Sequence, residues 1–210
     1  MKKIEIIGRW LKEGSKILIL GCGNGEILKE LQREKKVKGF GIDINESKVF
    51  EAISDGLSVL QGDINTDLFD WPGKSFDFVI AHDIVQIMIK PDVIIKQMIE
   101  LGDKVIISFP NFAYFLIRMN ILFLGRMPKT KILPYEWYDT PNIHLFTIKD
   151  FKEFCKKENL EIIDEYYTGL GKKTISKFMR PNLLAEFAYF LISNKKQIRN
   201  STASLLSIPY

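Results

Sequence analysis

A glycine-rich turn joins an apolar run to a helical pattern near the start of the chain, and it sets the fold class. The apolar run covers residues 17–20, and Gly21, Gly23 and Gly25 follow it at alternate positions. Beyond them, residues 26–31 place aliphatic side chains on one helical face. Glycines admit positive φ and the close approach of a ligand, and the helix N-terminus offers unpaired N–H groups to an anion. The segment therefore predicts a strand, a turn and a helix arranged as a nucleotide-type loop.

The spacing of these glycines indicates which type of nucleotide-binding loop the chain has. The dinucleotide fingerprint requires a glycine at the position that Glu26 occupies, and the Gly-Lys-Ser/Thr of a Walker loop is absent. The remaining pattern, G-x-G-x-G, is similar to the first motif of the class I methyltransferases that use S-adenosylmethionine (SAM). The alternative is a tight strand–helix turn that binds no ligand.

Length and composition indicate one globular domain. The chain has 210 residues, of which 46% are hydrophobic and 27% charged. We expect a domain over residues 1–193 and a basic tail over 194–210. The net charge of +4 is too small to indicate nucleic-acid binding, and two cysteines and two histidines support neither a disulfide framework nor a metal site. No signal-type apolar region occurs at the start, and the apolar stretches 112–124 and 183–192 are shorter than a membrane span of about 20 residues. We therefore expect a cytoplasmic protein without nucleic-acid, membrane or metal partners.

Apolar runs that alternate with helical patterns indicate a doubly wound sheet. An amphipathic helix through Ile4, Ile7, Trp10 and Leu11 is expected to pack beside it. Helical patterns follow the first, second and fourth runs, and strands that alternate with helices in this way predict a parallel sheet. The last two runs are expected to form an antiparallel pair at the edge. We therefore predict an α/β fold with a mostly parallel, seven-stranded sheet and strands at 17–20, 37–42, 58–61, 76–81, 104–109, 161–167 and 186–193.

Residues 112–145 interrupt this alternation. A helix is predicted over 112–124, and a loop rich in Pro, Tyr and Trp follows over 125–142. Loops of this length in a compact domain are usually functional, so we interpret 112–145 as a lid or partner-binding insertion. After it, Thr147 and Asp150 have the spacing of a capping box and predict a new helix.

Acidic residues follow the predicted second and third strands. Asp43 stands 20 positions after Gly23 and can accept hydrogen bonds from both hydroxyls of a ribose. Asp63, preceded by Gly62, can accept a hydrogen bond from an adenine amino group. Each alone is also an ordinary turn residue, but ligands bind at the carboxyl ends of adjacent strands in open α/β sheets. The candidate cofactor-binding residues are Gly21, Cys22, Gly23, Asn24, Asp43, Ile44, Gly62, Asp63, Ile64, Ala81 and His82.

The two histidines leave the chemistry open. His82 follows the predicted fourth strand, where it can act as a general base or line the pocket as a neutral histidine. The run from Ala81 to Asp83 lacks the Asn/Asp-Pro-Pro-aromatic motif of methyltransferases that act on DNA bases, which argues against that activity. His144 has a comparable ambiguity, and no catalytic residue is assigned.

Longer motifs together resemble one named family. The runs GRMPKT at 125–130 and PYEWYDTPNIHL at 134–145 are distinctive, and the glycine loop, GID at 41–43 and QGD at 61–63 accompany them. These motifs resemble those of the MetW proteins of methionine biosynthesis. The resemblance implies a class I methyltransferase fold, SAM or S-adenosylhomocysteine (SAH) as ligand, and an activating or regulatory partnership with homoserine O-acyltransferase. On this basis, the residues expected to face substrate or partner are Asn111, Arg126, Trp137, Tyr138, Asp139 and His144.

One position departs from the family pattern. The place two residues before Gly21 is normally acidic, and here it is Ile19. An acidic residue there helps to orient the methionine end of SAM, and a hydrogen bond to a charged group contributes about 1.5–3 kcal/mol. We therefore expect weaker binding of the methionine end, while Asp43 and Asp63 hold the adenosine end. The alternatives are an active methyltransferase on a small metabolite, a fold retained only as a partner surface, and RNA or membrane association through the tail.

Overall fold

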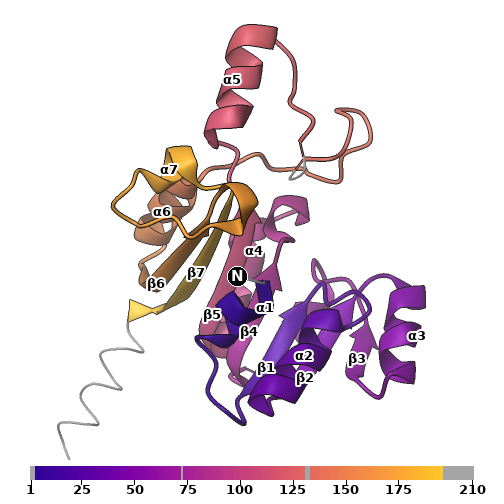
Figure 1. Cartoon of the computed structure of the whole chain (residues 1–210). Helices are drawn as coiled ribbons and strands as arrows, with labels where there is room; N and C mark the ends of the chain where they lie inside the picture. The colour runs from indigo at the N-terminus through magenta and orange to yellow at the C-terminus, as the bar shows by residue number, and fades with distance from the viewer. Residues whose placement is uncertain (1–2, 72, 131–132, 196–210) are drawn as a thin grey trace, which may run out of the picture.

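A seven-stranded sheet with helices on both faces forms the body of the protein (Figure 1). The computed structural model describes residues 3–71, 73–130 and 133–195. The strands are β1 (Lys16–Leu20), β2 (Lys38–Asp43), β3 (Ser58–Gln61), β4 (Phe76–His82), β5 (Gly102–Pro110), β6 (Leu160–Thr168) and β7 (Phe187–Asn194). The α-helices are α1 (Lys3–Gly8), α2 (Glu26–Lys35), α3 (Glu46–Ser54), α4 (Pro91–Leu101), α5 (Phe115–Leu124), α6 (Ile148–Lys157) and α7 (Pro181–Leu184). Short 3-10 turns are η1 (Asp67–Asp70), η2 (Val85–Ile87) and η3 (Leu170–Lys172).

The order of strands across the sheet is β3-β2-β1-β4-β5-β7-β6. The first five strands pair in parallel, whereas β7 lies between β5 and β6 and is antiparallel to both. The predicted doubly wound, seven-stranded α/β sheet is therefore confirmed. The expected antiparallel pair is present as well, with β6 as the outermost strand.

Some predicted boundaries differ from the observed ones. The first helix ends at Gly8, so Trp10 lies beyond it, where its Nε1 donates a hydrogen bond to Asp164 (2.8 Å). The helix predicted from residue 112 begins at Phe115 instead. Strand β7 continues to Asn194, which pairs with β6, so this residue belongs to the sheet rather than to a tail. Residues 196–210 of the expected tail lie outside the described residues.

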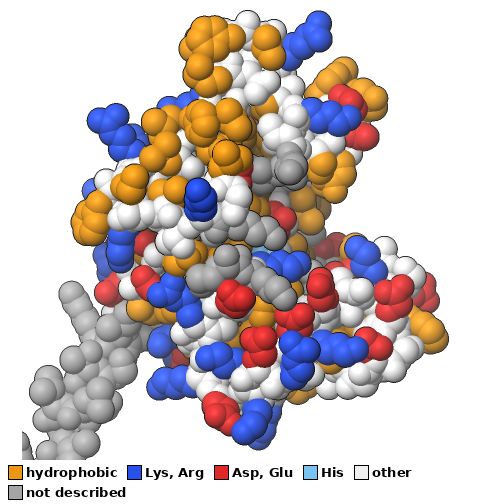
Figure 2. Space-filling model, in the orientation of Figure 1, with side chains coloured by type: hydrophobic (Ala, Val, Ile, Leu, Met, Phe, Trp, Pro, Cys, Tyr) orange, Lys and Arg blue, Asp and Glu red, His pale blue; other side chains and the backbone are white. Residues whose placement is uncertain are grey.

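The helix α5 stands away from the sheet at the top of Figure 1, and the loop that follows it runs back toward the body. A small cluster of Tyr114, Ile117 and Leu133 holds the base of this insertion together. Figure 2 shows hydrophobic side chains gathered over α5. Within the described ranges, no helix is both long enough and apolar enough to cross a membrane.

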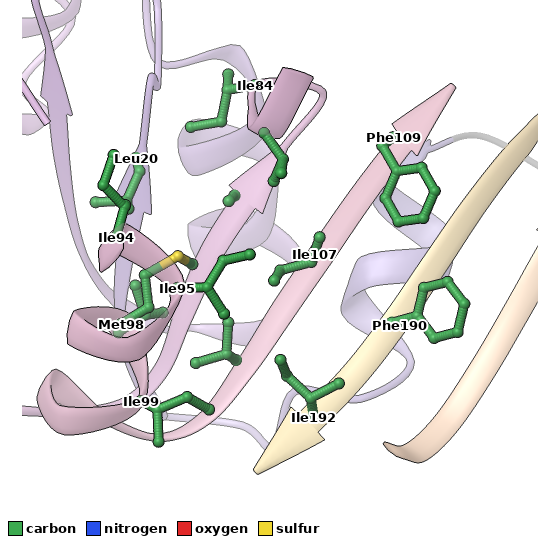
Figure 3. Close-up of a cluster of buried hydrophobic side chains, with 14 of the residues drawn as sticks. Leu20, Ile84, Ile94, Ile95, Met98, Ile99, Ile107, Phe109, Phe190 and Ile192 are labelled. Atoms are coloured by element: carbon green, nitrogen blue, oxygen red, sulfur yellow. The ribbon is translucent and has the colours of Figure 1, made fainter. Parts of the chain in front are cut away.

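The core consists of two layers because alternate residues of a strand point to opposite faces of the sheet. One layer contains Leu20 and Ile107 together with the apolar face of α4, and it extends to Phe109 and Phe190 (Figure 3). The other layer contains Ile19, which packs in the cluster that includes side chains of α1 and α2. These two layers fix the strands and so position the loops at their carboxyl ends.

Candidate functional site

The carboxyl ends of β1, β2, β3 and β4 meet at one edge of the sheet. Leu20, the last residue of β1, pairs with Ile42 on one side and with Ala81 on the other. Asp43, the last residue of β2, pairs with Gln61 at the end of β3. The structure therefore brings together the glycine loop and the segments that begin at Asp43, Gly62 and Ala81. We call this region the ligand edge.

The backbone of the glycine loop has a conformation that residues with a Cβ rarely adopt. Gly21, Gly23 and Gly25 have φ values of 60°, 58° and 79°, in the left-handed region. A Cβ at Gly21 would lie 2.9 Å from a methyl carbon of Ile84, and a Cβ at Gly25 would lie 2.3 Å from Leu57. The loop is therefore a tight turn whose shape requires these glycines.

The close packing of the following helix depends on a different glycine. The dinucleotide fingerprint obtains this packing from a third glycine inside the loop. Here a Cβ at Gly39 of β2 would lie 2.1 Å from Leu28 of α2, so Gly39 lets the helix approach the sheet. The absence of the fingerprint glycine at Glu26 thus leaves the strand–helix packing intact.

The carboxylate of Asp43 connects the ends of β1 and β2. Its Oδ2 accepts a hydrogen bond from the N–H of Gly23 (2.7 Å), and its Oδ1 accepts one from the N–H of Asn45 (2.9 Å). Each oxygen of a carboxylate can accept more than one hydrogen bond, so acceptor capacity remains on this half-buried side chain. Asp43 therefore holds the glycine loop in place and can still accept hydroxyl donors.

The Asp63 turn is organised by residues that the sequence reasoning missed. Asp63 Oδ1 accepts hydrogen bonds from both the backbone N–H (2.8 Å) and the side-chain amide (2.7 Å) of Asn65. The backbone N–H of Asp63 donates to Asp67 Oδ2 (2.7 Å). A Cβ at Gly62 would lie 2.7 Å from the same Asp67 oxygen. The run from Asp63 to Asp67 carries a recognisable turn signal that could have indicated this arrangement.

The other candidates at the ligand edge differ in accessibility. Asn24 and Ile44 are exposed, and Ile64 is half-buried against the core. Ala81 is 0% exposed, so neither its side chain nor its backbone presents a surface that a ligand could contact. Burial, followed by the charge of Asp43, raises the pKa of the Cys22 thiol to about 12, and this thiol therefore stays protonated at neutral pH.

His82 belongs to a row of side chains that crosses four strands. The strand register places it beside Ser108 of β5, then Tyr189 of β7 and Tyr166 of β6. His82 Nδ1 lies 2.5 Å from Ser108 Oγ, and its ring stacks on Tyr189 with 6.1 Å between centroids. Burial, with a smaller effect from the charge of Lys3, lowers the pKa of His82 to about 4. The imidazole is therefore neutral at physiological pH, and Ser108 and Tyr189 were missed because three separate strand pairings bring the row together.

Ile19 lies on the same face of the sheet as this row, beside Ile80, which is two residues before His82 on β4. It pairs with Gly41 and Ile80, and it is 1% exposed. Its neighbours in the buried cluster include Ile6 and Ile7 of α1. The position that is normally acidic is therefore part of an apolar interior here.

The residues expected to face a substrate or partner differ in exposure. Arg126, Trp137, Tyr138 and Asp139 are exposed on the insertion, and the rings of Trp137 and Tyr138 contact each other edge to face at 5.6 Å. Asn111 is fully buried, in contrast.

The side chain of Asn111 joins three parts of the fold. Its Nδ2 donates to the carbonyls of Asn182 (3.1 Å) and Ala185 (2.9 Å), and its Oδ1 accepts from the N–H of Ala113 (3.2 Å). A contact between this side chain and a partner would require these bonds to break, so the structure gives Asn111 a structural role.

His144 is half-buried, in the loop that leads from the insertion to α6. Its backbone N–H donates to the carbonyl of Gln86 (3.0 Å), and its Nε2 is buried with no hydrogen-bond partner among the described residues. It borders an apolar cavity of about 220 Å³ that Phe146 and Phe154 also line. No group of three or more His, Cys, Asp or Glu side chains that could hold a metal ion occurs in the described part of the chain.

Comparison with solved structures identifies the fold. A SAM-dependent methyltransferase of Thermotoga maritima, described as a possible histamine N-methyltransferase, superposes with a TM-score of 0.63 at 18% identity, covering 91% of this chain and 87% of that one. A SAM-dependent methyltransferase of Archaeoglobus fulgidus superposes with a TM-score of 0.64 at 15% identity, covering 92% and 95%. The chain therefore has the class I SAM methyltransferase fold.

Comparison with sequences identifies the family. The chain is 29% identical over 194 residues to the bifunctional methionine biosynthesis protein MetXA/MetW of Rhodopirellula baltica, covering 88% of this chain and 31% of that one. It is 30% identical over 107 residues to the ribosomal protein L11 methyltransferase of Dictyoglomus turgidum, covering 50% and 36%. The chain thus spans only about a third of the length of these two relatives. The family model described as methionine biosynthesis protein MetW matches residues 2–192. Since this match covers nearly the whole sequence, the chain belongs to the MetW family.

Proposed function

We propose that this chain is the activating or regulatory partner of a homoserine O-acyltransferase. The observation that carries the proposal is the relative from Rhodopirellula baltica, which joins a MetW part and a part named MetXA in one protein. Fusion of two parts keeps them at a high effective concentration, which favours parts that act together. The exposed, aromatic insertion of this chain supports the same interpretation, because apolar surface of this kind marks interaction sites.

The ligand edge supports SAM or SAH as the small-molecule ligand of this partner. At Gly23 a Cβ would meet only Lys48, at 3.9 Å, so the middle of the glycine loop is open to a ligand. Asp43 retains acceptor capacity for ribose hydroxyls, and Asp63 follows the neighbouring strand. Ile19 leaves the methionine end without the usual carboxylate on β1. Binding through the adenosine end, with little or no methyl transfer, agrees best with this arrangement. A ligand that prefers one state of a complex shifts its population, so such a protein can report the level of the end product.

An active methyltransferase on a small metabolite is the second candidate. The position of His82 at the end of β4, beside the ligand edge, favours it, although the pKa of about 4 makes this imidazole a weak general base at neutral pH. This candidate requires acceptor-dependent release of SAH from SAM by the chain alone. Such release must disappear in Asp43→Ala.

The partnership is tested with the purified chain and the homoserine O-acyltransferase of the same organism. Acyl transfer from acyl-CoA to homoserine is followed with the enzyme alone, with the chain added, and with an equal mass of serum albumin. The proposal expects a rate increase that saturates near equimolar chain and does not occur with albumin. An acyltransferase whose rate is unchanged by the chain at any ratio would contradict the proposal.

A further inference from the structure

The last turn of α5 is apolar on every side. Ile121, Leu122, Phe123 and Leu124 are 49%, 74%, 69% and 65% exposed. Successive residues of an α-helix are about 100° apart, so these four side chains surround the helix instead of forming one stripe. A flat surface can cover only one stripe, whereas a helix that is apolar all round is normally enclosed. The end of α5 is therefore shaped for a groove that encloses it.

The base of α5 is fixed, so the helix is presented to a partner already formed. Of its ten residues only Ile117 is buried, in the cluster with Tyr114 and Leu133. Arg118 Nε donates to the carbonyl of Ala113 (2.6 Å), and Gly125 ends the helix with φ of 59°. A preformed element loses less conformational freedom on binding than a loop does.

The charge of α5 distinguishes between classes of partner. Its sequence, FLIRMNILFL, contains Arg118 as the one charged residue, and that side chain is bonded to the base of the helix. A nucleic acid requires basic groups, and helices that lie on membrane surfaces carry a charged polar face. The helix has a single basic group and no charged face, so its surface matches an apolar groove on a protein.

We propose that the last turn of α5 inserts into an apolar groove of the homoserine O-acyltransferase. This inference rests on the proposed function, and it adds the surface through which the partnership works. The fused relative supports this occupant, because this chain covers 31% of a protein whose name joins MetXA to MetW. Helices that dock into grooves concentrate their binding energy in a few large apolar side chains. Leu122 and Phe123, the most exposed of the four, are expected to supply it.

The test replaces both side chains, in Leu122→Glu with Phe123→Glu. The matched control is Phe50→Glu on α3, since Phe50 is 70% exposed and α3 lies away from α5 (Figure 1). Association with the acyltransferase is measured by sedimentation velocity, together with the acyltransferase rate and the thermal unfolding midpoint. The double variant is expected to bind about tenfold more weakly or worse and to lose activation in proportion, with an unchanged midpoint. The control is expected to behave as the wild type.

Two results separate this inference from the proposed function. If the wild-type chain neither binds nor activates the acyltransferase, the proposed function fails and the inference fails with it. If the wild type and the double variant bind and activate equally, the inference alone is overturned. Two other outcomes also overturn the inference. In one, the chain associates with itself; in the other, it floats with neutral vesicles. In both, the double variant loses this behaviour and still binds the acyltransferase.

Discussion

At the scale of single residues, the ligand edge combines one acid that organises the loop with one histidine that is kept neutral. Asp43 accepts hydrogen bonds from the backbone of both adjoining segments, so its first role is to hold the glycine loop. His82 contacts the hydroxyl of Ser108 and the ring of Tyr189 in place of solvent. The burial that keeps this imidazole neutral also makes the stability of the fold depend on pH.

The depressed pKa of His82 predicts a loss of stability in acid. Its ordinary pKa of 6.5 falls to about 4 in the folded protein, so between these values the unfolded chain binds more protons. The free energy of unfolding therefore rises with pH in this window, by at most about 1.4 kcal/mol per pH unit from this group. His82→Phe keeps a ring beside Tyr189 and removes the titration. In urea unfolding from pH 4 to pH 7, the free energy of unfolding is expected to depend less steeply on pH in the variant than in the wild type.

The comparison with the variant is needed because Asp83 has the opposite effect. Its carboxylate turns toward Gln86 Nε2 (2.7 Å), and loss of water around it raises its pKa to about 6. A raised carboxyl pKa lowers stability as pH rises, and this contribution is present in both proteins. Wild-type and His82→Phe curves that run parallel across the window would refute the assignment to His82.

At the scale of elements, the return from the insertion to the body depends on the start of α6. Thr147 Oγ1 accepts the N–H of Asp150 (3.3 Å), and Asp150 Oδ2 accepts the N–H of Thr147 (2.8 Å). The capping box predicted from the sequence is therefore confirmed. Gln86 of η2 adds a second link, because its carbonyl accepts the N–H groups of Ile143 (2.9 Å) and His144 (3.0 Å). These contacts connect the end of the insertion with the region beside the ligand edge.

Removal of the cap predicts a moderate loss of stability. Thr147→Ala leaves the N–H of Asp150 without its side-chain acceptor and is expected to lower the free energy of unfolding by about 1 kcal/mol. Thr147→Ser retains a hydroxyl and serves as the control. Chemical unfolding of the three proteins measures the difference. Equal midpoints for Thr147→Ala and the wild type would show that the box does not stabilise α6.

At the scale of the whole molecule, local patterns predicted most of the fold. The alternation of apolar runs and helical patterns was enough for the sheet class, and the positions of Asp43 and Asp63 after their strands were enough to place them on one edge. Both depend on short stretches of sequence, where periodicity and turn residues carry the information.

Features that depend on distant contacts were not predictable in this way. Asn111 has the same residue type whether it faces a partner or joins α7 to β5, and only the fold shows its burial. The row of His82, Ser108 and Tyr189 requires the register of three strands. The outward position of α5 was hidden as well, because a mostly apolar helix in a sequence normally indicates a buried one.

The account depends on a working ligand edge, and calorimetric titration with SAM and with SAH tests it most directly. The wild type is compared with Asp43→Ala and with Asp77→Ala. Asp77 is a matched control because its Oδ2 accepts a backbone N–H, that of Lys16 (2.7 Å), where β1 begins, at the opposite end of the strands. We predict micromolar binding that Asp43→Ala weakens by about tenfold or more and Asp77→Ala leaves unchanged. A folded wild-type protein that binds neither ligand, or an Asp43→Ala variant that binds as tightly as the wild type, would contradict the account.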